Sequence, residues 1–220
     1  MNKIINLIKL DFLTIMPYKM NIGLMLIFMI LFSSVRVNAA AMGIIIAYAA
    51  ILSSYPFSIG ESKHLDMLYA SLPVNRSEAV MGRYAYALLI QILLPVIQLI
   101  SRCAFDLAAS GFIWLTFMDI VSAVISIVIS SIIVFCQFPI LFKMGYNKSK
   151  AMSYFPVIVI IAGTVLGGGA LERLGLMDSV VRFVNSLNIA LIGAAVAIVY
   201  AVVLVTSYRL SVRFYSQRNL

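Results

Sequence analysis

The sequence predicts an all-α integral membrane protein with six transmembrane helices. Two observations predict this fold class. First, 63% of the 220 residues are hydrophobic and only 11% are charged, whereas a soluble domain is about half apolar and about a quarter charged. Second, six apolar stretches approach the length of about 20 residues that a helix needs to cross a bilayer. We expect residues 1–220 to form a single transmembrane domain.

Short polar segments separate the six predicted spans. These spans cover residues 20–35, 39–59, 84–101, 119–142, 151–170 and 187–207. The segment 2–15, before the first span, is too short and too charged to cross the membrane, and we expect it to remain uncleaved. Its apolar residues recur at helical spacing, at Ile4, Ile8, Phe12 and Ile15. This pattern predicts an amphipathic helix in the membrane interface.

Three other segments break the apolar pattern. The third span is followed by a polar stretch, residues 102–106, and the last span by a basic tail. Residues 171–186 place apolar side chains on one helical stripe and charged ones around the other side. We expect this segment to be a short amphipathic helix on the external face, between the fifth and sixth spans.

The distribution of positive charge predicts the orientation. The chain carries a net charge of +8, and with both termini inside, twelve of its 16 Lys and Arg residues lie in predicted cytoplasmic segments. Cytoplasmic loops of membrane proteins are enriched in these residues. We therefore expect a multi-pass protein of the cell membrane with both termini in the cytoplasm. The charge is explained by membrane topology, so we do not expect a nucleic-acid partner.

The sequence lacks the motifs of common enzymes and metal sites. No lysine follows a glycine, which excludes a Walker A phosphate loop. The chain has one histidine and no GxSxG motif, so we expect no zincin site, no nucleophile elbow and no bound metal or cofactor. No Asp or Glu lies in the middle of a predicted span, which argues against an ion-coupled carrier. We expect no catalytic residue.

Polar side chains form stripes on two of the predicted spans. They are Gln91, Gln98 and Arg102 on the third span, and Ser126, Ser130 and Gln137 on the fourth. One interpretation is hydrogen bonding between packed helices. The other is a mildly polar lining for a translocation path, with Arg102 at its outer end or simply extending to the interface. The sequence leaves both open.

The longest polar interruption runs from Tyr55 to Tyr84. Its first part places Leu65, Leu68, Tyr69 and Leu72 on one helical face, which predicts a short amphipathic helix ended by Pro73. Asn75 and Glu78 have the spacing of a capping box, so a second helix is expected to start there and continue into the third span. Such a segment is either a plain interfacial connector or a handle for a partner protein.

The run from Phe57 to Tyr84, FSIGESKHLDMLYASLPVNRSEAVMGRY, resembles the ABC-2 type permeases, specifically the compact six-span subfamily of peptide and drug exporters. In that family an acidic, Lys-containing helix follows the second span, and an SLPV-R turn and a GRY sequence follow it. The corresponding residues here are Glu61, Lys63, Ser71-Leu72-Pro73-Val74, Arg76 and Gly82-Arg83-Tyr84.

The resemblance implies a coupling helix that docks in a groove of a separately encoded ABC ATPase, which binds ATP and Mg²⁺. It also implies a dimer of permeases, formed by two copies or by close paralogues. The residues expected to couple to the ATPase are Glu61, Lys63, His64, Leu65, Asp66, Leu68, Leu72, Arg76 and Arg83. Within the family, the nearest likeness is to exporters of cytolytic or antimicrobial peptides, such as phenol-soluble modulins.

We therefore expect the membrane half of an ATP-driven exporter of amphipathic peptides or drugs. Two other functions stay open at this point. One is a non-transporting membrane protein, such as an immunity factor or an assembly subunit. The other is an ion-coupled carrier, whose transport would collapse with the ion gradient and ignore ATP.

Overall fold

The computed structural model describes residues 2–33, 38–62, 75–113, 115–149 and 189–217, together with residues 151 and 158. The main elements of this part of the chain are helices. They are α1 (Asn2–Ile15), the 3-10 helix η1 (Met16–Tyr18), α2 (Lys19–Ser33), α3 (Asn38–Ser62), α5 (Arg76–Ser110), α6 (Phe117–Met144) and α9 (Ile189–Gln217). The predicted all-α fold is confirmed for the described residues.

Five helical segments of the described chain are long and apolar enough to cross a membrane. They are Ile5–Phe32, Met42–Glu61, Arg76–Ser110, Asp119–Met144 and Gly193–Gln217. Each overlaps one predicted span, namely the first, second, third, fourth and sixth. Nearly all of the fifth predicted span, and the whole of the external helix predicted at 171–186, fall outside the described residues. The chain is thus a multi-pass membrane protein.

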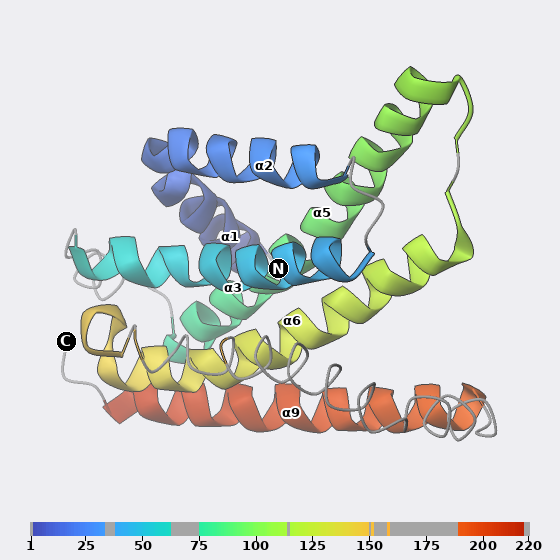
Figure 1. Ribbon diagram of the computed structural model, residues 1–220. Coiled ribbons are helices and arrows are strands. Elements are labelled where there is room, and N and C mark those ends of the chain that lie inside the picture. Colours follow the sequence, from blue (N-terminus) through green and yellow to red (C-terminus); the bar gives the residue numbers. More distant parts are fainter. Residues whose placement is uncertain are drawn as a thin grey trace.

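Helix α5 occupies the central position in this bundle. Figure 1 shows α2, α3, α6 and α9 running roughly side by side, while α5 crosses them obliquely. Helix α5 contacts α1, α2, α3, α6 and α9. A displacement of α5 therefore affects all five of these helices.

Two hydrophobic clusters hold α5 on two of its faces. Val80, Tyr84 and Ala87 belong to a cluster that is completed by aromatic residues of α3, α6 and α9. Tyr86, Ile90 and Leu94 belong to a second cluster, which is completed by α1, α2 and α3. Residues three or four positions apart share a helix face, so the two sets form two separate stripes. This double burial explains why α5 is the hub of the fold.

Two helices are longer than the sequence pattern predicts. Helix α5 continues through residues 102–106, predicted as a polar stretch, and ends at Ser110. The next residue, Gly111, caps it with a positive φ of 68°, which suits a helix terminus. Helix α9 continues through the predicted basic tail to Gln217. In both helices the extension carries polar side chains that pair with a neighbouring helix. A hydropathy pattern contains no information about such pairs.

Helix α1 buries a face that shares Ile15 with the predicted stripe. Among its described side chains, Leu7, Asp11 and Ile15 are buried, whereas the side chain of Phe12 is 42% exposed. These three are spaced four apart and so share one side of the helix. The helix at 2–15 is confirmed, but the burial of a carboxylate on its inner face could not be expected from an apolar pattern.

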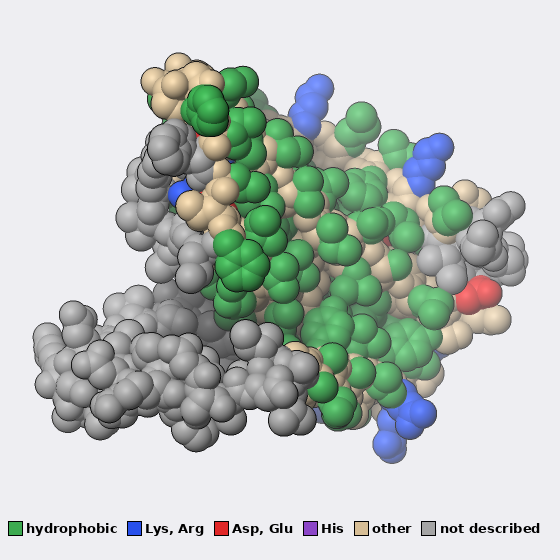
Figure 2. All heavy atoms as spheres, turned by 90° about the vertical axis from the view of Figure 1, so that its right-hand side faces the viewer, with side chains coloured by type: hydrophobic (Ala, Val, Ile, Leu, Met, Phe, Trp, Pro, Cys, Tyr) green, Lys and Arg blue, Asp and Glu red, His purple; other side chains and the backbone are tan. Residues whose placement is uncertain are grey.

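The surface of the described residues suits a membrane environment. Figure 2 shows one end of the molecule, where hydrophobic side chains dominate and the charged ones lie at the margins. Large apolar side chains are also exposed along α2, with Met20 at 80% and Leu24 at 64% exposure. In water such a surface would drive aggregation, whereas in a bilayer it contacts lipid or another protein.

Candidate functional site

The candidate site is the segment Asn75 to Tyr84, which we call the α5 base. It follows the predicted coupling segment, residues 61–72, most of which lies outside the described residues. The backbone N–H of Asn75 donates to Glu78 Oε2 at 3.0 Å, and this carboxylate lies in the first turn of α5. The predicted capping box is therefore present. It starts a regular helix immediately after the predicted coupling segment.

Arg76 joins the α5 base to the end of α9. Its Nη1 donates to the carbonyl oxygen of Tyr215 at 3.1 Å and to that of Ser216 at 2.7 Å. The last carbonyls of a helix lack partners within that helix and carry its partial negative charge. A guanidinium bound there is favourable, and it fixes the beginning of α5 to the end of α9.

Gly82 brings the α5 base against α1. A Cβ atom built at this position would lie 2.9 Å from the Cβ of Leu7. This is well inside the normal van der Waals separation of carbon atoms, about 3.5 to 4.0 Å. Only glycine therefore permits this approach of the two helices, as in other close helix contacts of membrane proteins.

Arg83 contacts α3. Its guanidinium carbon lies 4.3 Å from the centre of the Phe57 ring, and the residue is buried, at 8% exposure. An arginine over an aromatic face is attracted by the negative charge of the ring face, and the attraction grows as water is excluded. The side chain thus crosses from α5 to α3 near the C-terminal end of α3.

Tyr84 joins α5 to α9 and α6. Its hydroxyl lies 2.6 Å from Ser207 Oγ and 2.8 Å from Ser211 Oγ, both on α9. Ser207 also donates to the carbonyl oxygen of Phe135 on α6. Because Ser207 uses its proton there, Tyr84 must donate to Ser207 and accept from Ser211. The hydroxyl of Tyr84 is therefore satisfied on both sides.

The three residues of the GRY sequence consequently contact three different sets of helices. Gly82 touches α1, Arg83 touches α3, and Tyr84 touches α9 and, through Ser207, α6. Buried polar contacts and tight packing resist sliding because a small displacement removes them. The α5 base can therefore transmit a displacement of its N-terminal end to most of the bundle.

The residues predicted to couple to the ATPase fall into two groups. Lys63, His64, Leu65, Asp66, Leu68 and Leu72 lie outside the described residues. Arg76 and Arg83 belong to the α5 base and make the intrachain contacts given above. Glu61 Oε2 accepts the backbone N–H of Asn147 at 2.9 Å, which ties the end of α3 to the helical turn 146–149 after α6.

The predicted polar stripes lie inside the described bundle. Gln91, Ser126, Ser130 and Gln137 are fully buried, and Gln98 is 6% exposed. Ser131 donates to Gln91 Oε1 at 2.6 Å, which links α6 to α5. Within the described residues, neither side-chain atom of the Gln137 amide makes a hydrogen bond. Hydrogen bonding between helices thus accounts for the amide oxygen of Gln91, whereas its Nε2 makes no hydrogen bond within the described residues.

Arg102 forms a buried ion pair at the other end of α5. Its Nη1 lies 2.6 Å from Asp119 Oδ1, and the side chains are 13% and 1% exposed. The other carboxylate oxygen, Oδ2, accepts the backbone N–H of Thr116 at 2.8 Å and its hydroxyl at 2.7 Å. Asp119 therefore caps α6 and also holds it to α5.

Sequence reasoning missed the partners of the α5 base on α9. Ser207, Ser211 and Tyr215 are buried and spaced four residues apart, so they share one face of the helix. A Ser-x₃-Ser-x₃-Tyr pattern in an apolar helix is a detectable hint of a polar contact. Sequence reasoning also missed Asp119, both as the partner of Arg102 and as the cap of α6. The spacing Thr116-x-x-Asp119 is that of a capping box and could have indicated the cap.

We predict that replacing Tyr84 with phenylalanine lowers the stability of the protein by about 1 to 2 kcal/mol, because two hydrogen bonds are lost. Tyr86→Phe is the matched control, since its hydroxyl makes one longer bond, to the carbonyl of Leu52 at 3.2 Å. Unfolding of both variants in detergent, followed by circular dichroism, measures the difference. Equal losses would contradict the role of the Tyr84 contacts.

Comparison with known proteins identifies one family. Residues 6–216 match the family described as "ABC-2 family transporter protein". No curated protein and no solved structure matches the chain. Within the described residues no cluster of His, Cys, Asp or Glu is arranged to hold a metal ion.

Proposed function

Because the chain belongs to the ABC-2 transporter family, we propose that it is the membrane-spanning permease subunit of an ATP-driven exporter. A separate ABC ATPase supplies the energy and binds ATP and Mg²⁺, since this sequence contains no phosphate loop. The protein resides in the cell membrane with both termini in the cytoplasm, as its charge distribution favours.

The arrangement of the α5 base is the observation that best supports this function. The base begins where the predicted coupling segment ends, and it is bonded to the end of α9 through Arg76 and packed on α1 through Gly82. A plain connector needs none of these contacts. A segment that receives force needs all of them, because force must pass from its point of arrival into the other helices.

The proposed mechanism is a rigid-body motion of α5. Closure of the ATPase pushes the segment 61–72, and this segment moves the α5 base. Helix α5 has 35 residues and is therefore about 52 Å long, which is enough to cross the bilayer. The Arg102–Asp119 ion pair near its far end passes the motion to α6. The interface between two permease copies then rearranges to open a path.

We propose an amphipathic peptide or a hydrophobic drug as the cargo, moved out of the cell. The resemblance to peptide and drug exporters supports this class of cargo. The buried polar residues Gln98, Ser126, Ser130 and Gln137 are the candidates for its polar contacts once the helices separate. A mildly polar path suits a cargo that has both an apolar and a polar face.

Charge reversal in the coupling segment tests the proposal. We expect Asp66→Lys to reduce co-purification of the ATPase about tenfold or more, since a like-charge contact at an interface costs several kcal/mol. Export in proteoliposomes should fall accordingly, while membrane insertion is unchanged. Asp66 is preferable to Glu61 because Glu61 has an intrachain partner at Asn147.

The control is Lys148→Glu, an exposed charge reversal outside the segment, which should leave both the complex and export intact. Unaltered ATPase binding and export in Asp66→Lys would contradict the coupling role. A stable complex without nucleotide-dependent activity would instead favour an assembly or immunity subunit. Transport that collapses with the ion gradient and ignores ATP would favour an ion-coupled carrier.

A further inference from the structure

An apolar groove opens between the N-terminal helices and α5. It has a volume of about 350 Å³, and its walls come from α1, η1, α2, α3 and α5. Leu26, Ile90 and Leu93 are among its lining residues. Gly23 also lines it, and a Cβ at that position would meet nothing within 4 Å. The groove is therefore open above α2 and is not filled by the described side chains.

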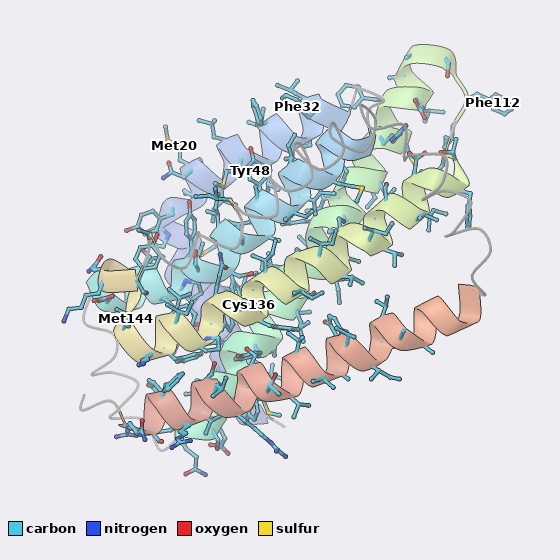
Figure 3. The ribbon with its side chains drawn as sticks, turned by 60° about the horizontal axis from the view of Figure 1, so that its bottom comes forward. Met20, Phe32, Tyr48, Phe112, Cys136 and Met144 are labelled. Carbon is cyan, nitrogen blue, oxygen red and sulfur yellow. The ribbon has the colours of Figure 1, made fainter. Side chains whose placement is uncertain are left out.

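Lys19 gives this groove a charged end. It is the only charged side chain among the described lining residues, and it is exposed. Lys19 and Gly23 are four residues apart and therefore lie on the same face of α2. Figure 3 shows α2 at the edge of the bundle, with Met20 labelled near this end and Phe32 near the other. An apolar groove with a cation at one end suits an amphiphile with an anionic head.

The same face of α2 leads into a second groove. Leu26 lines the first groove, and Ile30, one turn further along, lines a second one of about 450 Å³ between α2 and α5. From Lys19 to Ile30 the helix rises by about 16 Å. Half of the hydrocarbon core of a bilayer is about 15 Å thick. The two grooves together therefore match the length of one lipid chain from the leaflet on the Lys19 side.

A second copy of the chain would suit the two grooves less well than a lipid does. None of the residues that line the two grooves in the described part of the chain is Asp or Glu. A copy packed face to face here would place Lys19 against apolar surface within the membrane boundary. A cation without a counter-charge is unfavourable there. A lipid phosphate supplies the missing charge.

We propose that this groove binds one acidic phospholipid, with its phosphate at Lys19 and an acyl chain between α2 and α5. The proposal is independent of transport, because it rests on the shape and charge of the groove alone. A basic residue near the membrane surface contributes enough attraction for about a fivefold preference for an anionic lipid.

Tryptophan fluorescence can test the site. The chain has a single tryptophan, Trp114, so Trp114→Phe gives a silent background for the full-length protein. Leu93→Trp then places a probe in the groove, and Ile92→Trp serves as the control. Leu93 and Ile92 are 46% and 51% exposed on the same helix, but adjacent residues point to different sides of it and only Leu93 lines the groove. Quenching is measured in phosphatidylcholine vesicles with brominated phosphatidylglycerol or brominated phosphatidylcholine.

We expect the probe at 93 to prefer phosphatidylglycerol about fivefold, and the probe at 92 to show little preference. Lys19→Gln should abolish the preference at 93, and Lys19→Arg should retain it. Gly23→Leu should fill the groove and reduce quenching at 93 by both lipids. Equal preference at both positions, or a preference that survives Lys19→Gln, would overturn the proposal. Protection of the probe at 93 from both lipids would show that protein covers the groove, which would also overturn it.

Discussion

Replacing Asp119 with asparagine should destabilise the protein by about 3 to 5 kcal/mol, the largest effect that we expect from any single substitution. The reason is that Arg102 loses the carboxylate of Asp119 while its own side chain is only 13% exposed. Removing one member of a buried ion pair leaves the desolvation penalty of the other less well compensated. Thermal or denaturant unfolding in detergent micelles measures the loss.

Asparagine is chosen because it separates the two roles of Asp119. Its amide oxygen can still accept from the backbone N–H of Thr116, so the cap of α6 is retained and only the charge is removed. The double variant Arg102→Met with Asp119→Asn should recover most of the loss, since the guanidinium that faced the removed carboxylate is absent as well. If the double variant is as unstable as the sum of the two single variants, the ion pair is not the cause.

Much of the fold follows from residue patterns that act locally. Long apolar stretches must become helices in a bilayer, because no other backbone structure satisfies its own hydrogen bonds there apart from a closed barrel. The start of α5 at Arg76, capped by Asn75 and Glu78, was predicted from a spacing of three residues, and the structure has it. Local chemistry was sufficient for these features.

The contacts of the α5 base could not be predicted in the same way. The partners of Arg76 and Tyr84 on α9 are more than 120 residues away in the chain, and hydropathy carries no information about such pairs. The length of α9 was also missed, because Arg209 and Arg213 led us to predict that the last span ends at residue 207 and is followed by a basic tail. A helix can hold such residues at the membrane boundary when its opposite face, at Ser207 and Ser211, is buried.

Gly82→Ala should destabilise the protein by about 2 to 3 kcal/mol, the second largest effect. The added Cβ would lie 2.9 Å from the Cβ of Leu7, an atom fixed to the backbone that cannot rotate away, so α1 must separate from α5. The expected direction, a loss of stability, distinguishes Gly82 from a glycine at an open helical position. At an open helical position the same substitution stabilises by up to about 1 kcal/mol, because alanine is the better helix former.

Gly43 provides that control, since a Cβ there meets nothing within 4 Å. We expect Gly43→Ala to be neutral or stabilising, in contrast to Gly82→Ala. Because the added Cβ meets the Cβ of Leu7, the contact also predicts which substitution of Leu7 relieves the clash. Leu7→Ala keeps the obstructing Cβ and should not help, whereas Leu7→Gly removes that atom and should show a favourable coupling with Gly82→Ala in a double-mutant cycle. If Leu7→Ala relieves the loss as well as Leu7→Gly does, the close approach of α1 and α5 is not what requires glycine at position 82.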